Sequence, residues 1–91
     1  MSINSQVPYL YTLDGNNPDT LTITNAKSVT CYTSGAATDI TNSIGQQISL
    51  PDGVAIEMNA DTGNTLSSIV IVPQGGGTAY VSMLGGNGIV T

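Results

Sequence analysis

Short stretches of alternating hydrophobic and polar residues follow one another along the chain, separated by clusters of turn-forming residues. Alternation with a period of two is the pattern of a strand with one buried face. It predicts strands over residues 7–13, 20–24, 28–32, 48–50, 54–59, 66–72 and 79–84. No segment shows the periodicity of an amphipathic helix. Strands at this spacing predict an all-β domain, built as a small antiparallel β-sandwich, a jelly roll or a barrel.

Two of these segments allow a more specific prediction. Pro51-Asp52-Gly53 is a strong turn signal, so the strands before and after it are expected to pair as a hairpin. Residues 66–72 form the most apolar segment, and the run Ile69-Val70-Ile71-Val72 favours a central strand covered on both faces. Val70 is therefore expected to be buried, and an aspartate there should prevent soluble folding.

The remaining segments read as connections and ends. Residues 33–47 are predicted to be loop, because their Ser34-Gly35-Ala36-Ala37 centre favours no regular element. Residues 1–6 and 85–91 are predicted to be extended, flexible arms. Residues 1–91 are then one β domain with an arm at each end, since a chain of this length has no room for a second core.

The size of the core raises the question of what stabilises it. A domain this small buries a limited fraction of its surface and usually relies on disulfides, a metal or a partner subunit. Cys31 is the only cysteine and the chain has no histidine, so an internal disulfide is excluded and a zinc site is not expected. A partner, including further copies of the same chain, is the expected support.

Charge is scarce. Charged residues make up 8% of the chain, with one Lys, no Arg and a net charge of −5. Phosphate and anionic lipid both require several cations, so neither nucleic acid nor a charged membrane surface is an expected partner. The polar surface consists mainly of Thr, Ser, Asn, Gln and Gly, which bury with neutral hydrogen bonds. Such a surface favours a protein that is covered by neighbours.

The sequence also bears on location. No apolar run approaches the length of a membrane span. Residues 1–6 have neither the basic start nor the apolar centre of a secretory signal. Together with the single cysteine, these features predict synthesis and folding in the cytosol.

Two acidic motifs each have a chemical and a structural interpretation. Asp61-Thr62-Gly63 matches the triplet of aspartic proteases, whose chemistry needs two carboxylates sharing a proton at a dimer axis. Its flanking residues do not fit that family, so a turn is the preferred interpretation. The loop Asp14–Asp19 has oxygen ligands at spacings suitable for calcium, but lacks the glutamate and glycine positions of an EF-hand. An Asx-rich turn is preferred, and calcium binding is left open.

Three further features also have two interpretations each. Gly75-Gly76-Gly77 and Gly85-Gly86-Asn87-Gly88 lack the following helix of a phosphate loop and read as strand connections. Lys27 invites an isopeptide crosslink assisted by Glu57, but lysines are mostly exposed and a polar turn is preferred. The pattern also offers four tyrosines as a sugar-stacking surface, although packing in the core and at edges is favoured: Tyr9 and Tyr11 on one strand face, and Tyr32 and Tyr80 in other strands.

Catalysis is not expected. Without histidine no Ser-His or Cys-His couple exists, so the usual activated nucleophiles are missing. The sequence assigns no catalytic, cofactor-binding or metal-binding residue, and it predicts a protein that is not an enzyme.

The charge-poor composition rich in Thr, Ser, Asn and Gly, the rhythm of short strands and the chain length together resemble the small all-β virion accessory proteins of tailed bacteriophages, of the capsid decoration (cement) or head-fibre type. The resemblance covers the whole chain but no diagnostic motif. It implies a structural protein that binds larger capsid or tail subunits in many copies, stabilises their lattice, and resides in the virion after synthesis in the host cytoplasm. The alternative is a carbohydrate- or host-binding module of a phage fibre or spike.

Overall fold

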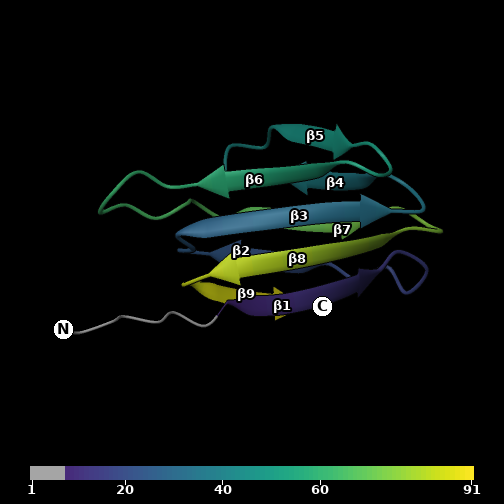
Figure 1. The fold of residues 1–91 in the computed structure, drawn as a ribbon, viewed down its shortest axis with the longest axis horizontal. Helices are drawn as coiled ribbons and strands as arrows, with labels where there is room; N and C mark the ends of the chain where they lie inside the picture. The colour runs from purple at the N-terminus through teal and green to yellow at the C-terminus, as the bar shows by residue number, and fades with distance from the viewer. Residues whose placement is uncertain (1–7) are drawn as a thin grey trace.

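The computed structural model describes residues 8–91, which form two antiparallel sheets packed face to face as a β-sandwich (Figure 1). Sheet A has the strand order β1-β8-β3-β6, and sheet B has the order β5-β4-β7-β2-β9. The prediction of a small all-β domain is confirmed, and the sandwich is the architecture adopted. Within the described range no helix occurs, and so none that could cross a membrane. The strands are β1 (Tyr9–Asp14), β2 (Leu21–Thr24), β3 (Ser28–Ser34), β4 (Thr38–Thr41), β5 (Gln47–Leu50), β6 (Ala55–Asn59), β7 (Ile69–Pro73), β8 (Thr78–Leu84) and β9 (Asn87–Val90).

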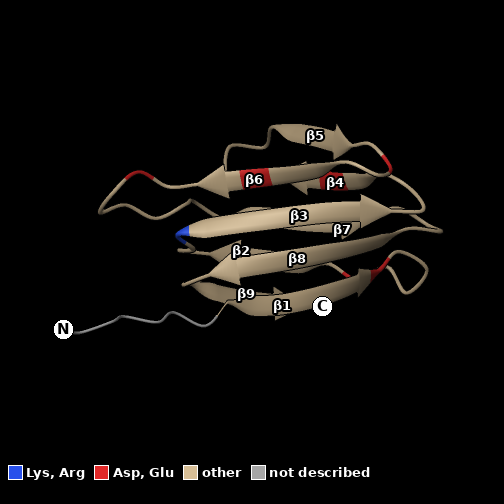
Figure 2. Cartoon of the chain, viewed as in Figure 1, with Lys and Arg blue, Asp and Glu red and all other residues tan. Residues whose placement is uncertain are grey.

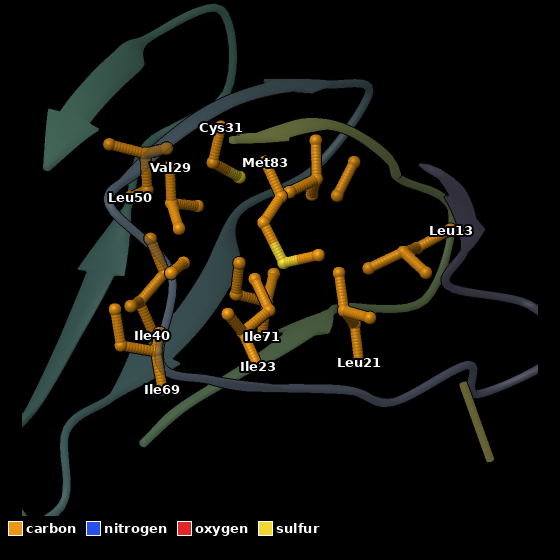
Figure 3. Close-up of a cluster of buried hydrophobic side chains, with 13 residues drawn as sticks. Leu13, Leu21, Ile23, Val29, Cys31, Ile40, Leu50, Ile69, Ile71 and Met83 are labelled. Atoms are coloured by element: carbon orange, nitrogen blue, oxygen red, sulfur yellow. The ribbon is translucent and has the colours of Figure 1, made fainter. Parts of the chain in front are cut away.

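The core lies between the sheets and is aliphatic. Alternate residues of the strands point inward, because successive side chains of a strand lie on opposite faces. Met83 of sheet A points toward Ile23 and Ile71 of sheet B, in the middle of the cluster (Figure 3). The buried set is Leu13, Leu21, Ile23, Ala26, Val29, Cys31, Ile40, Leu50, Ile69, Ile71, Ala79, Val81 and Met83.

The hairpin predicted around Pro51-Asp52-Gly53 is wrong. The turn itself forms, with the Val54 amide donating to the Pro51 carbonyl over 3.1 Å and Gly53 at a φ of 81°. However, β5 pairs with β4 in sheet B, whereas β6 pairs with β3 in sheet A. The chain therefore changes sheets at this turn, because turn chemistry fixes a reversal of direction but not the neighbour of each strand.

The real hairpin of this region is β4 with β5, over residues 38–50, so the prediction of loop for residues 33–47 is wrong for β4. β4 and β5 pair from Thr38–Leu50 to Thr41–Gln47. Their connection is organised by Asn42, whose side-chain oxygen accepts hydrogen bonds from the amides of Ile44 and Gln46. Gly45 completes the turn at a φ of 84°. β4 has only four residues and lies in polar surroundings, so the sequence pattern does not indicate it as a strand.

The C-terminal arm predicted over residues 85–91 is also wrong. Residues 87–90 form β9, which pairs with β2 at the edge of sheet B. Gly85 and Gly86 carry the chain from sheet A to sheet B with φ values of 70° and 77°, and a Cβ on Gly86 would overlap the backbone at residues 24–26. The other predicted arm, residues 1–6, lies outside the described residues.

The most apolar segment is a central strand, as predicted, but it is covered on one face only. β7 lies between β4 and β2. Its inward residues Ile69 and Ile71 are buried, whereas Val70 and Val72 on the outer face are half-buried. The expectation that Val70 is buried is therefore wrong, because an unbroken apolar run does not distinguish a strand covered on both faces from one covered on a single face.

One buried polar contact joins the sheets. The hydroxyl of Thr38 in β4 donates to the hydroxyl of Thr33 in β3 over 2.8 Å, and that hydroxyl in turn donates to the Ala36 carbonyl over 2.6 Å. Both threonines are buried, so the chain of hydrogen bonds satisfies groups that water cannot reach. This contact fixes the short connection by which the chain passes from β3 in sheet A to β4 in sheet B.

Candidate binding surfaces

The broad faces of the sandwich carry little charge. Figure 2 shows half of the six acidic residues in connections at the ends of the strands, and the single lysine beside the start of β3. Within the strands only Asp14, Asp39 and Glu57 are charged. Asp39 on the outer face of sheet B accepts hydrogen bonds from the Ser49 hydroxyl and the Gln74 amide. Any ligand of these faces must therefore be recognised mainly through neutral contacts.

The edge of the sandwich at β5 and β6 is open. A hollow of about 310 Å³ lies there between the two sheets, lined mainly by apolar side chains. The strand at its rim, β5, contains no charged residue and no proline. Ile48 in β5 is 48% exposed, and Ile44 at the tip of the preceding turn is 77% exposed. The lining residues are Ile40, Asn42, Gln46, Ile48, Met58, Leu66, Ser67, Ser68 and Ile69.

The opposite edge of the sandwich is closed. Tyr11 of β1 points inward from sheet A and reaches across to Gly88 of β9 in sheet B. A Cβ at position 88 would overlap the Tyr11 ring and hydroxyl, so the glycine is what allows this contact. The two edges therefore differ: an aromatic side chain covers one, and the other exposes the interior to an approaching molecule.

A second hollow, of about 260 Å³, lies on the outer face of sheet A. Its outward side chains belong to two neighbouring rows across the strands. One row is Leu10, Ser82 and Thr30, and the next is Thr12, Tyr80 and Tyr32. The Tyr32 and Tyr80 rings are near-parallel, with centroids 6.1 Å apart and planes inclined by 25°. Both rings are close to half exposed.

The tyrosines predicted to share a strand face do not form an exposed aromatic surface. Tyr9 and Tyr11 lie on the inward side of β1, opposite Met83 and Val81 of β8, and Tyr11 packs against the core. The exposed pair comes from β3 and β8 instead. Sequence reasoning missed it because the two residues are 48 positions apart, and only the pairing of β3 with β8 brings them together.

The Asp14–Asp19 loop is held by its own carboxylates. Asp14 accepts a hydrogen bond from the Asn16 amide, and Asp19 accepts one from the Asp14 amide, each over 2.9 Å. The Asn16 side chain in turn accepts from the Gly76 amide of the β7–β8 turn. Gly15 packs so closely on the Gln74 carbonyl that a Cβ there would overlap it. The predicted Asx-rich turn is confirmed, and among residues 8–91 no three acidic, histidine or cysteine side chains gather as metal ligands.

The protease-like triplet is an exposed turn. The Asn64 amide donates to the Asp61 carbonyl over 2.9 Å, and Gly63 has a φ of 82°. The turn lies in the connection from β6 to β7, and its three residues are exposed. The predicted turn is confirmed. The glycine-rich connection predicted at residues 75–77 is found between β7 and β8, whereas of that predicted at residues 85–88 only residues 85–86 connect β8 with β9, because Asn87 and Gly88 belong to β9.

The remaining reactive side chains differ in their exposure to solvent. Lys27 and Glu57 are both exposed, so they lack the burial that a crosslinking trio requires, and the Glu57 carboxylate accepts from the Asn59 side chain instead. Cys31 lies in the core with no exposed surface, and burial raises the pKa of its thiol to about 11. A thiol that is buried and protonated is a poor nucleophile and a poor metal ligand.

The open edge with its apolar hollow and the hollow on the outer face of sheet A are thus the two candidate binding surfaces. Comparison of the chain with protein-family models, with curated proteins and with solved structures found no match.

Proposed function

We propose that this protein is a structural accessory subunit of a virion, which binds larger capsid or tail subunits in many copies and stabilises their lattice. The observation that carries the proposal is the open edge, where an uncharged strand borders an apolar hollow. On this proposal the protein is made in the host cytoplasm and functions in the assembled particle.

The exposed backbone of β5 supports this role. Soluble proteins usually protect an edge strand with charged residues, proline or a bulge, since a bare edge offers unpaired amides and carbonyls to another chain. β5 has the sequence Gln47-Ile48-Ser49-Leu50 and carries no such protection. A partner segment that adds a strand here gains main-chain hydrogen bonds without needing charges.

The hollow behind β5 supports the same partner. An added strand points alternate side chains toward the sandwich interior. Ile40, Met58 and Ile69 line the space that those side chains would enter. An uncharged, extended segment with apolar residues at alternate positions is therefore the chemistry that fits this edge.

A weak contact of this kind becomes effective in a lattice. Repetition by symmetry converts many modest contacts into firm attachment through multivalency. A subunit that binds only the assembled state also raises the stability of that state by mass action. This is the physical basis for expecting shells that carry the protein to resist heat better than shells that lack it.

The test is to purify virions produced with this protein, detect it by mass spectrometry, and compare the heat resistance of particles with and without it. Ile48→Lys, which places a charge at the open edge, should lower the copy number per particle at least tenfold. Ile89→Lys is the matched control, since Ile89 is a similarly exposed isoleucine on β9 at the closed edge.

Absence of the protein from virions would contradict the proposal, as would equal occupancy by the wild type and the Ile48→Lys variant. A location restricted to a few copies at a tail tip would instead favour the host-binding alternative.

A further inference from the structure

The outward side chains of sheet A lie in rows that cross its strands. Reading across the strands, Leu10, Ser82, Thr30 and Glu57 form one row, because these residues are register partners in successive strands. The adjacent row runs through Thr12, Tyr80, Tyr32 and Ala55. Small hydroxyl-bearing residues therefore lie beside the two aromatic rings.

The hydroxyls of this face are free to bind a ligand. Within residues 8–91, the side-chain hydroxyls of Thr12, Thr30, Ser82 and the two tyrosines take part in none of the side-chain hydrogen bonds. Glu57 uses one carboxylate oxygen to accept from Asn59, which leaves the other oxygen for a further donor. The face thus combines neutral donors and acceptors with one anionic acceptor.

The hollow gives these groups a common centre. It is lined by Leu10, which is 76% exposed, by the Tyr32–Tyr80 pair, and by the small residues Thr12, Thr30 and Ser82. A volume of about 260 Å³ on an open face suits one ring of a larger molecule.

From this arrangement we propose that the outer face of sheet A binds a neutral, pyranose-containing glycan, with one sugar ring in the hollow against Tyr32 and Tyr80. The proposal is independent of the virion role proposed above.

The chemistry of a sugar matches the face group by group. A pyranose ring has a face of C–H groups that packs on an aromatic ring, and a rim of hydroxyls that both donate and accept hydrogen bonds. Tyrosine offers an apolar ring face together with a polar tip. Thr30 and Ser82 would bond to the hydroxyl rim, and Glu57 at the end of their row would accept from it.

Charge selects among sugars. The hollow is lined by no cationic residue, and the protein carries a net charge of −5 with one lysine. Sialylated, sulfated or phosphorylated glycans would therefore be repelled, with no cation to pair with their anionic groups. Neutral hexose or N-acetylhexosamine chains are the class that fits.

The experiment has two stages. The full chain is first applied to an array that holds neutral and acidic glycans. A neutral oligosaccharide that binds is then titrated into isotope-labelled protein and followed by amide chemical shifts. The amides of Tyr32, Tyr80 and Ser82 should shift in a saturable manner, and acidic glycans should give no signal.

Variants separate the site from the fold. Tyr80→Ala and Tyr32→Ala should each weaken binding about tenfold, the effect expected from losing one stacked ring. Tyr9→Ala is the matched control, because Tyr9 is an exposed tyrosine of the same sheet that does not line the hollow. If an alanine variant does not fold, Tyr80→Phe and Thr30→Val replace it. Tyr80→Phe keeps the stacked ring and should retain most of the binding, whereas Thr30→Val removes a hydroxyl that bonds to the sugar and should weaken binding.

Four results would overturn the proposal. They are an array with no neutral glycan bound by the folded protein, saturable shifts that map to another surface, equal weakening by Tyr9→Ala and Tyr80→Ala, and selective binding of acidic glycans. If no glycan shifts these amides but a proline-rich peptide does, the face is a peptide site and the glycan assignment is wrong.

Discussion

Cys31 shows how one side chain is controlled by its position in the core. It lies in β3 and faces the opposite sheet, with no surface accessible to water (Figure 3). Removal from water penalises the thiolate, which is why burial raises the pKa of this thiol from 9.0 to about 11. The residue serves as a small hydrophobic group, and its protonation state couples to folding.

The coupling predicts a loss of stability at alkaline pH. The pKa is higher in the folded protein, so the contribution is complete below the unfolded pKa of 9.0 and disappears as the pH rises toward about 11. Between pH 8 and pH 10.5 the free energy of unfolding should fall by up to about 2 kcal/mol more in the wild type than in Cys31→Ala. Urea denaturation followed by circular dichroism at both pH values measures the difference. Parallel pH profiles for the two proteins would show that Cys31 does not contribute.

The alternation of hydrophobic and polar residues predicts well which side chains point into the core and which point outward. Leu21 and Ile23 are buried and the threonines beside them are not, as the period of two requires. Alternation says nothing about residues that meet across strands. The Tyr32–Tyr80 pair and the Tyr11–Gly88 contact each depend on sheet order, so the candidate glycan site could not be read from the sequence.

Secondary structure elements were predictable where the strand is long and alternating, and not where pairing decides the outcome. Turn residues marked the reversal at Pro51-Asp52-Gly53, but the chain crosses between sheets there and the amide of Gly53 donates to the Thr33 carbonyl of sheet A. β4 and β9 are no shorter than β2, but their polar or glycine-rich surroundings conceal them in the sequence. Their identity as strands comes from the neighbours that they hydrogen-bond.

β7 provides a test of the one-sided burial found for the central strand. Ile71 has no exposed surface, so Ile71→Asp would bury an unpaired carboxylate and should abolish cooperative folding, a loss above about 4 kcal/mol. Val70→Asp changes the neighbouring residue on the outer face and should cost less than about 2 kcal/mol. Soluble expression and thermal denaturation of the two variants give the comparison. An unfolded Val70→Asp protein, or a native-like Ile71→Asp protein, would contradict the assignment of the two faces.

For the molecule as a whole, the difference between its two edges determines how copies should meet. The closed edge has Tyr11 across it, and the open edge has the bare β5 strand. Without a larger partner, two copies can pair their β5 strands antiparallel, so that each copy hydrogen-bonds the unpaired backbone amides and carbonyls of the other. Such an arrangement has two-fold symmetry. Because β5 is uncharged, such pairing would depend little on ionic strength.

We therefore expect self-association at micromolar concentration, measured by sedimentation velocity. The dissociation constant should change less than about threefold between 0.05 and 0.5 M salt, since a neutral interface offers few charges to screen. Ile48→Lys should give a monomer, and Ile89→Lys should still associate. A wild-type protein that stays monomeric and stable throughout, or that dissociates only on adding salt, would contradict this expectation.

The order of strands within the sheets has a consequence for how the protein is made. β8 lies between β1 and β3, and β9 forms the sheet edge beside β2. The strands β1, β2 and β3 therefore have partners that are encoded late in the chain. During synthesis, at roughly 5–20 residues per second, β1 and β3 leave the ribosome without the strand that joins them. Pairing between such distant segments is also intrinsically slow. Closure of both sheets therefore follows the synthesis of β8 and β9, and a nascent chain that stalls before them leaves the inward, apolar residues of β2, β3 and β7 open to aggregation or to chaperones.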